Sequence, residues 1–242
     1  MDYLVFQLQA PLSAWGETAV GEFRPTANYP SESALLGLLA AALGIRREEE
    51  DAHAALRKGY GFAIGVLASG RLLRDYHTAQ VPGRFKLKNR PHHTRLDEIN
   101  LPKGDLNTIL STRDYRQDAA SLVAVQMRDG APYTLSDVVQ ALAKPRFTLY
   151  LGRKACPPAL PLNPQIISVE NAQAALHDYH KKLVERSSEK VPAFERIVWG
   201  EGIESGMVHD LEVVRKDRLL SRGHWQFGDR IEYVALAPQG EQ

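Results

Sequence analysis

The order of regular segments along the chain constrains its fold more than any other feature of the sequence. Alternating apolar residues predict strands, the first with one well-buried face, and helical spacing behind serine or threonine caps predicts helices. The segments of this series are 3–9 (strand), 34–43 (helix), 60–68 (strand), 120–127 (strand), 135–143 (helix) and 147–151 (strand). A strand–helix–strand order that occurs twice predicts an α+β, ferredoxin-like or RRM-like fold, which many RNA-recognition modules share.

The two copies are separated by residues 80–118, which contain prolines and glycines, are rich in charge and show no sustained period. A loop of this length is usually functional or disordered. The sequence therefore predicts a compact domain formed by 1–79 and 119–158, an inserted extended arm over 80–118, and a strand-rich C-terminal extension over 159–242 that packs on the compact domain. Further elements are expected at 47–58 (helix), 71–78 (strand, joined to 60–68 by a Ser69-Gly70 hairpin turn), 170–183 (helix), 211–214 and 231–236 (strands).

The composition is that of an ordinary globular protein, with 44% hydrophobic and 24% charged residues. Cys156 is the single cysteine, which excludes an intramolecular disulfide framework and a cysteine-rich zinc site. His177 and His180 are one helical turn apart, but no nearby carboxylate completes a metal-ligand pattern. Nothing resembles a signal peptide, and no apolar run is long enough to span a membrane. We therefore expect a cytoplasmic protein without a cofactor, a metal or a membrane partner.

The distribution of charge is more informative than the net charge of +1. Two stretches, Gln80 to Arg95 and Lys144 to Lys154, are basic and contain no acidic residue. Their cations are Arg84, Lys86, Lys88, Arg90, Arg95, Lys144, Arg146, Arg153 and Lys154. Separated basic stretches can form a local phosphate-binding surface, although charge clusters taken alone are more often solvated loops.

Residues 144–157, Lys-Pro-Arg-Phe-Thr-Leu-Tyr-Leu-Gly-Arg-Lys-Ala-Cys-Pro, interleave cations with aromatic residues. Cations neutralise phosphates and aromatic faces stack on unpaired bases. From the residues alone, however, Phe147 and Tyr150 are expected in the core rather than as base platforms, since aromatic residues dominate protein cores. Arg153 with Lys154 is the best candidate here for RNA contact, and Gly152 would permit close approach of a ligand backbone. The thiol of Cys156 is expected to be a small packed group.

The start of the helix at 34–43 is a second candidate site. Free backbone amides, the hydroxyls of Ser31 and Ser33 and the positive end of the helix dipole together can bind an anion. Arg24, a short distance upstream, could supply the charge that such a site needs. Most capped helix starts bind nothing, so this pattern alone is weak.

A catalytic alternative involves His77, at the end of a predicted strand beside the basic stretch 80–95. Together with Tyr76 and Lys86 or Lys88, it could supply an acid, a base and a positive charge for metal-free RNA cleavage by a 2′-hydroxyl. A histidine that only forms structural hydrogen bonds is the competing interpretation.

Several motifs, in their order along the chain, resemble the CasD family of type I-E CRISPR systems. They are Gln-Ala-Pro-Leu-Ser-Ala-Trp-Gly (9–16), Arg-Pro-Thr (24–26), Tyr-Pro-Ser-Glu-Ser-Ala-Leu-Leu-Gly-Leu-Leu (29–39), Leu-Arg-Asp-Tyr-His-Thr (73–78) and the segment 144–157. The resemblance covers about residues 2–160. It implies a ferredoxin-like palm with an extended thumb at 80–118. It also implies a non-catalytic subunit of the Cascade ribonucleoprotein, which holds the 5′ handle of the CRISPR RNA (crRNA) and caps the backbone in antiviral defence.

The resemblance also implies partners and binding residues. The thumb would contact the neighbouring backbone subunit, the large subunit that reads the protospacer-adjacent motif would dock nearby, and target DNA would be reached through the complex. The residues expected to bind RNA are Trp15, Arg24, Ser31, Ser33, His77, Arg84, Lys86, Lys88, Arg90, Lys144, Arg146, Tyr150, Gly152, Arg153, Lys154 and Cys156. Trp15 is either a stacking platform or a core anchor. Two rival functions stay open: a metal-independent endoribonuclease that processes the crRNA precursor, as in type I-C systems, and a protein-only assembly module.

Overall fold

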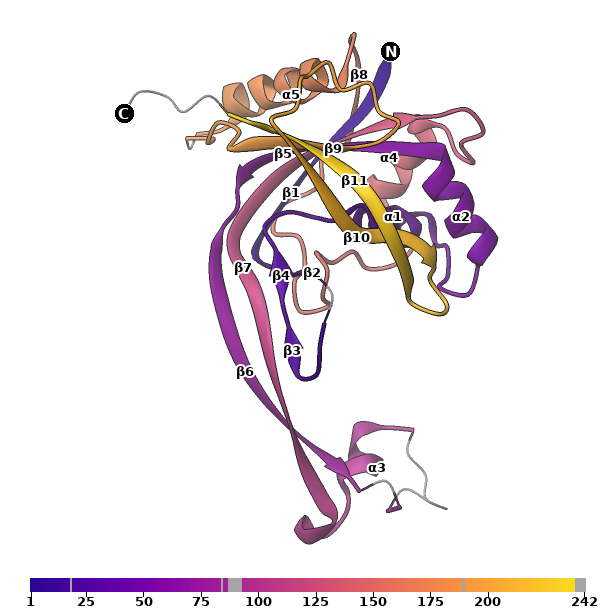
Figure 1. Ribbon diagram of the computed structural model, residues 1–242, viewed down its shortest axis with the longest axis vertical. Coiled ribbons are helices and arrows are strands. Elements are labelled where there is room, and N and C mark those ends of the chain that lie inside the picture. Colours follow the sequence, from indigo (N-terminus) through magenta and orange to yellow (C-terminus); the bar gives the residue numbers. More distant parts are fainter. Residues whose placement is uncertain (18, 84, 87–92, 189, 238–242) are drawn as a thin grey trace.

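The computed structural model describes residues 1–17, 19–83, 85–86, 93–188 and 190–237. One sheet of nine strands runs through this part of the chain, and helices cover it on both faces (Figure 1). The strands are β1 (Asp2–Ser13), β2 (Trp15–Gly16), β3 (Phe23–Arg24), β4 (Thr26–Ala27), β5 (Tyr60–Ala68), β6 (Arg71–Pro82), β7 (Leu106–Met127), β8 (Gln165–Ser168), β9 (Arg196–Gly200), β10 (Leu211–Ser221) and β11 (Gln226–Leu236). The helices are α1 (Glu32–Leu43), α2 (Glu50–Gly59), α3 (Arg95–Ile99), α4 (Leu135–Ala143), α5 (Ala172–Arg186) and the short 3-10 helix Lys103–Asp105.

Strand β1 lies inside the sheet, between β7 and β8, and both of its faces are buried. Leu4 and Phe6 belong to the core cluster that includes helices α1 and α4, whereas Tyr3 and Val5 pack in a second cluster with α5. The expectation of a single buried face was wrong, because α5 covers the other face as well. The strand also continues past Pro11, which has no register partner in β7.

The centre of the sheet has the strand order β5-β7-β1-β8, and all of these neighbours are antiparallel. Helix α1 follows β1, and helix α4 follows β7. The prediction of a helix at 135–143 is confirmed by α4, which Thr134 caps by accepting a hydrogen bond from the backbone N–H of Asp137 at 3.2 Å.

The predicted strand at 147–151 is wrong, since residues 144–164 contain no helix or strand. The backbone amides of Arg146 and Phe147 donate to the carbonyl oxygens of Ala42 and Ala41, at 3.0 and 3.1 Å, so this segment binds the end of helix α1 rather than the sheet. The short strand β8 takes the place beside β1 instead.

The long excursion is a two-stranded arm rather than an irregular loop (Figure 1). Strand β6 pairs antiparallel with the first half of β7, from Arg71 opposite Gln117 to Pro82 opposite Leu106. The strand predicted at 71–78 lies within β6. Beyond it, cross-strand backbone hydrogen bonds form the ribbon without burying one face in a core, so the sequence there lacks the alternation that identifies an ordinary strand.

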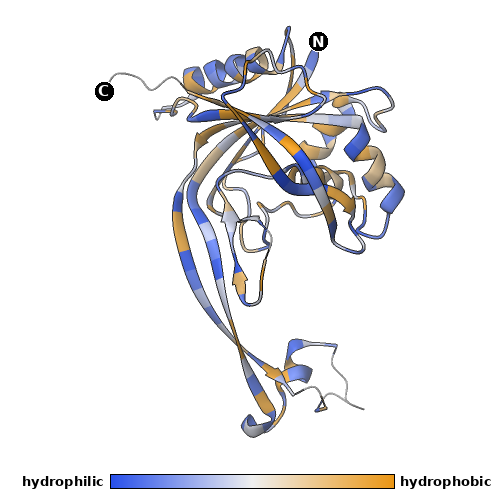
Figure 2. Cartoon of the chain, in the orientation of Figure 1, coloured by the Kyte–Doolittle hydropathy of each residue, from blue (hydrophilic) through white to orange (hydrophobic). Residues whose placement is uncertain are grey.

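Strands β5 and β6 do not form the predicted hairpin, because they pair with successive halves of the long strand β7. Gly70, with φ +69°, makes the bend between them, and a Cβ there would lie 2.4 Å from the carbonyl oxygen of Gln117. The bend lets β6 continue away from the sheet. Figure 2 shows hydrophobic residues along the arm, between the sheet and the short helix α3 near the tip.

The sheet continues through the C-terminal part of the chain, because β9 pairs with β5, β11 with β9, and β10 with β11. The strands predicted at 211–214 and 231–236 and the helix predicted at 170–183 are confirmed by β10, β11 and α5. Buried ion pairs fix the β10–β11 hairpin: Arg230 donates to Asp217 at 2.6 and 3.0 Å and to Glu232 at 2.7 Å. No helix in the described part of the chain is long and apolar enough to cross a membrane.

Candidate nucleic-acid interface

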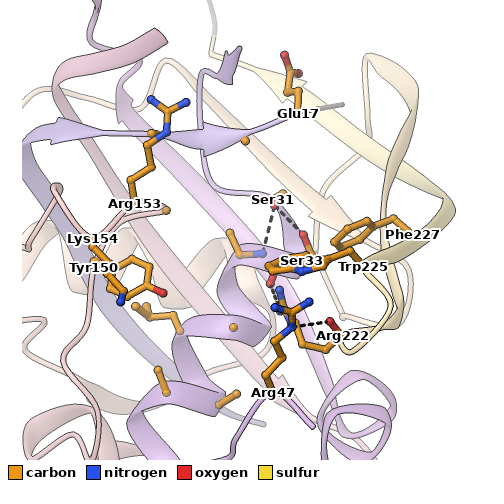
Figure 3. Close-up of a pocket in the computed structure, with 18 of the residues that line it drawn as sticks. Glu17, Ser31, Ser33, Arg47, Tyr150, Arg153, Lys154, Arg222, Trp225 and Phe227 are labelled. Atoms are coloured by element: carbon orange, nitrogen blue, oxygen red, sulfur yellow. Dashed lines mark hydrogen bonds between the residues drawn. The ribbon is translucent and has the colours of Figure 1, made fainter. Parts of the chain in front are cut away.

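A groove of about 840 Å³ opens between helix α1, the segment 147–154 and the tip of the β10–β11 hairpin. Figure 3 shows Tyr150 and Lys154 on one side of it and Trp225 and Phe227 on the other. Small residues of α1, among them Ala34 and Ala41, form its floor. We refer to this feature as the groove.

The segment 147–154 forms one side of the groove, which we call the first wall. Gly152 shapes this wall through a contact within the chain rather than through the ligand contact that the sequence suggested. Its φ of +86° favours glycine, and a Cβ there would lie 1.7 Å from the carbonyl oxygen of Ala14. The backbone N–H of Ala14 in turn donates to Leu151 at 3.0 Å. The close approach predicted at this glycine is therefore made by the chain itself, not by a ligand, and it holds the wall against the end of β1.

The two cations of this wall differ in their surroundings. Arg153 donates to the carbonyl oxygens of Asp114 and Arg24, at 3.0 and 3.1 Å, and its guanidinium lies 4.6 Å from the centre of the Tyr115 ring. Lys154 is exposed and has no hydrogen-bond or ion-pair partner among the described residues. Arg153 thus braces the wall against the arm, and Lys154 is the freer of the two for an external anion.

Aromatic side chains of the first wall are open to solvent. Phe147 and Tyr150 expose 43% and 39% of their surfaces, so neither is a core residue. Arg24 is also exposed at the groove, with its guanidinium donating to Gly21 at 2.5 Å and Phe23 at 3.1 Å.

The opposite side of the groove, which we call the second wall, is formed by the tip of the β10–β11 hairpin, and it was not predicted from the sequence. Trp225 is 55% exposed, and the guanidiniums of Arg47 and Arg222 lie 4.6 and 5.6 Å from the centre of its ring. Arg222 also donates to the carbonyl oxygen of Ser33 at 3.0 Å, which fastens the hairpin to helix α1. The only signal in the sequence was the short distance along the chain from Arg222 to Trp225 and Phe227.

The predicted anion site at the start of α1 is largely occupied by the chain. The hydroxyl of Ser31 accepts a hydrogen bond from the N–H of Ala34 at 3.2 Å and lies 3.1 Å from the hydroxyl of Ser33. The carboxylate of Asp217 accepts from the N–H of Glu32 at 3.0 Å. Because a carboxylate already lies at the positive end of the helix, this prediction is corrected: the serines line the groove, but the amides of Glu32 and Ala34 already have acceptors within the chain.

Two residues predicted to bind RNA are buried. Trp15 exposes 5% of its surface in the core, which decides in favour of the core anchor over the stacking platform. Cys156 exposes none, and burial raises the pKa of its thiol even though Arg153 opposes that shift. Their side chains therefore leave almost no surface for contact with RNA.

Other predicted residues lie away from the groove. The side chain of Arg146 packs on Gly44, at the end of α1 opposite Ser31, and neither it nor Lys144 lines the groove. Arg84, Lys88 and Arg90 lie outside the described residues.

No hydrogen bond or ion pair joins Tyr76, His77 and Lys86, the residues of the catalytic alternative that the structure describes. His77 pairs with the carboxylate of Asp75 on β6, and Tyr76 points to the opposite face because neighbouring strand residues alternate. Lys86, beyond the end of β6, pairs with Asp105 at 2.8 Å. His177 and His180 lie elsewhere, with ring centres 5.1 and 5.0 Å from Phe194.

The chemistry of the groove suits a single-stranded nucleic acid. Among the described residues its lining has five lysines and arginines and one carboxylate. They are Arg24, Arg47, Arg153, Lys154 and Arg222, against Glu17. Cations contact phosphates, and exposed rings such as Trp225 and Tyr150 stack on unpaired bases.

Comparisons with known proteins find similar chains over most of the length of this one. The CRISPR system Cascade subunit CasD of Escherichia coli (strain K12) is 34% identical over 185 residues, which are 73% of this chain and 76% of that protein. A chain from a solved CRISPR RNA-guided surveillance complex is 27% identical, with a TM-score of 0.64 over 97% of this chain and 90% of that chain. A structure described as a Cas protein shares the fold, with a TM-score of 0.62 at 24% identity over 98% of this chain and 95% of that one.

The family match is equally extensive. Residues 3–231 match the family described as CRISPR-associated protein (Cas_Cas5), and the resemblance of the sequence motifs to CasD is confirmed. The chain therefore belongs to the Cas5 family of CRISPR-associated proteins.

Proposed function

We propose that this protein is a non-catalytic RNA-binding subunit of a type I-E Cascade complex, and that its groove holds the 5′ handle of the crRNA. The observation that carries the proposal is the pairing of cations and exposed rings on both walls of the groove. The relative from E. coli is by its name a Cascade subunit, and the similar structure comes from an RNA-guided complex.

In the proposed complex, the handle runs between the two walls as a single strand. Lys154 and Arg24 contact its phosphates, because both are exposed cations at the groove. Trp225 offers its ring to a base, while Arg47 and Arg222 hold the ring in place.

The wider architecture fits this role. The four central strands have the spatial order β8-β1-β7-β5, and helices α1 and α4 follow β1 and β7 along the chain. This arrangement supports a ferredoxin-like palm. The β6–β7 arm is the thumb, and it contacts the neighbouring backbone subunit. The protein caps the backbone, the large subunit that reads the protospacer-adjacent motif docks nearby, and target DNA is reached only through this cytoplasmic complex.

The geometry favours this function over its two rivals. An endoribonuclease would need an acid and a base on one side of a substrate, whereas Tyr76 and His77 point to opposite faces of β6 and Lys86 pairs with Asp105. A protein-only assembly module would not need exposed rings interleaved with cations in a concave groove.

A salt titration tests the proposal. Binding of a labelled 5′-handle RNA is measured by fluorescence anisotropy for the wild type, for Lys154→Ala, and for Lys181→Ala as a matched control on the exposed side of α5. Lys154→Ala should weaken binding and reduce the dependence of log K on log salt by about 0.7 for each lost phosphate contact. Lys181→Ala should change neither quantity. Equal binding by all three proteins would contradict the proposal.

A further inference from the structure

A second pocket, of about 420 Å³, lies between the end of helix α2, strand β10 and the turn after β9. Five of its lining residues are cations and two are carboxylates. The cations are Arg57, Lys58, Arg128, Arg218 and Arg230, and the carboxylates are Glu32 and Glu201. None of these cations lines the groove, so the pocket is a separate accumulation of positive charge.

Two of the five cations are already neutralised. Arg230 is held in its buried ion pairs with Asp217 and Glu232, and Arg218 lies 3.2 Å from the carboxylate of Glu201.

The remaining three cations have no carboxylate within ion-pair distance among the described residues. Arg57 donates to the carbonyl oxygen of Leu219, and Arg128 donates to that of Gly202 at 2.8 Å. Lys58 is exposed in the last turn of α2. A pocket that gathers three such charges is poised for an external anion.

Arg128 is held in a fixed orientation at this pocket. Its guanidinium lies against Gly202, where a Cβ would be 2.5 Å from the guanidinium carbon, and φ at this glycine is +76°. A Cβ at Gly61 would lie 3.1 Å from Nη2 of the same side chain. Nε and Nη2 are used by the backbone of the 201–202 turn, whereas Nη1 makes no hydrogen bond to the described residues.

Burial disfavours the positive charge of Arg128, and no carboxylate within ion-pair distance among the described residues compensates for this cost. Desolvation lowers the pKa of Arg128, and the nearby Arg218 lowers it further, while Glu32 and Glu201 oppose the shift. The opposite charge of an anion bound beside the guanidinium would offset both unfavourable effects.

We infer that this pocket is a second contact site for the phosphodiester backbone of a nucleic acid. No aromatic side chain is among its described lining residues, so it can hold a phosphate but offers no ring for a base. Contact here is therefore independent of base sequence.

The position of the pocket relative to the groove supports a polynucleotide over a free phosphate. Glu32 lines the pocket, whereas Ser31 and Ser33 line the groove. The pocket and the groove therefore both reach the first turn of α1. Leu220 of the β10–β11 hairpin lines the pocket and Arg222 lines the groove. A strand bound in the groove can reach the pocket by crossing this hairpin.

The test combines Lys58→Ala with Arg128→Gln, which keeps an amide donor beside Gly202. The matched control combines Lys181→Ala with Arg186→Gln, two exposed cations of α5 that line neither cavity. Binding of labelled oligouridine and of a DNA duplex of the same length is measured over a salt series, and thermal melting checks that each variant is folded.

For each lost phosphate contact, the pocket variant should bind oligouridine about fivefold more weakly at about 0.1 M salt. The dependence of log K on log salt should fall by about 0.7 for oligouridine and by about 0.9 for the duplex. An effect on oligouridine alone identifies an RNA strand as the natural ligand, and an effect on the duplex alone identifies DNA. If the folded variant binds both oligouridine and the duplex as tightly as the wild type, the inference is overturned. The same holds if the variant keeps both affinities but no longer binds a partner subunit, since the pocket would then contact protein rather than nucleic acid.

The same measurements in a Trp225→Ala background separate this inference from the proposed function. The two sites share no cation, so the pocket substitutions should weaken binding by the same factor in either background. A factor that disappears in the Trp225→Ala background would mean that the pocket residues act only through the groove, and it would contradict a second site.

Discussion

Gly152 connects the conformation of a single residue to the shape of the groove wall. Its left-handed backbone and the carbonyl oxygen of Ala14 leave no room for a side chain. We expect Gly152→Ala to lower the free energy of unfolding by at least about 1–2 kcal/mol, the cost of the left-handed conformation alone. Urea denaturation measures this, with Gly104→Ala as the control, since a Cβ at Gly104 meets no atom within 4 Å. Equal losses in the two variants would contradict the account of this turn.

The exposed ring of Trp225 is predicted to stack on a base of the handle. Trp225→Ala should weaken binding of the handle RNA by about 1–3 kcal/mol, the usual contribution of one base stacked on an aromatic side chain. Trp225→Tyr keeps a ring and should retain most of the affinity in the same anisotropy titration. If the alanine and tyrosine variants bind equally well, the ring does not stack on RNA.

His53 gives the stability of the protein a pH dependence. It is 5% exposed, its Nε2 lies 3.0 Å from the carbonyl oxygen of Arg46, and burial lowers its pKa below the usual 6.5. The unfolded chain therefore binds a proton before the folded protein does, so stability is fully present above about pH 6.5 and is lost as the pH falls through the folded pKa.

Urea denaturation at several pH values between about 7.5 and 5.5 checks this prediction. The free energy of unfolding should fall more steeply in the wild type than in His53→Gln, which cannot take up the proton. Parallel curves for the two proteins would show that His53 is not responsible.

At the scale of elements, the arm is the part of the molecule that most needs a partner. A two-stranded ribbon is marginally stable on its own, and the side chains of Leu72 and Tyr76, on one face of β6, are 50% and 63% exposed. Apolar residues placed this way are typical of a surface that a partner covers.

Replacing both Leu72 and Tyr76 by serine should therefore weaken association with the neighbouring backbone subunit more than it changes stability. We expect less of the variant to co-purify with the assembled complex, with a change in the free energy of unfolding within about 0.5 kcal/mol. Val208→Ser is the control, since this residue is 89% exposed on a loop away from the arm. Full co-purification of the arm variant would contradict a role in assembly.

The elements themselves were predictable where burial alone determines the pattern. Helix α4 buries one face and its sequence carries the helical period, whereas strand β5 is buried on both faces and is a short run of mostly apolar residues. The arm was predictable only in part, since the strand expected at 71–78 lies within β6. The pairing of β6 with β7 and the conformation of 144–164 were not predictable, because they depend on hydrogen bonds to β7 and to the end of α1, which leave no period in the sequence.

At the scale of the whole molecule, the groove is assembled from regions that are far apart in the sequence. The cations at Arg24 and Lys154 were predictable, since both lie in motifs that carry the family resemblance. The hairpin wall with Trp225 was not, because only the folded β10–β11 hairpin brings it over α1. Asp217 likewise caps a helix start 185 residues away in the chain, which no local pattern could indicate.

The most direct test of the central claim incubates the purified protein with a labelled crRNA precursor, without metal, and follows it on native and denaturing gels. Our account predicts that the RNA is shifted but intact, and that the shift is lost when the 5′ handle is removed. A discrete cut beside the handle, abolished by His77→Ala, would make the protein a processing nuclease and contradict the assignment of a non-catalytic subunit.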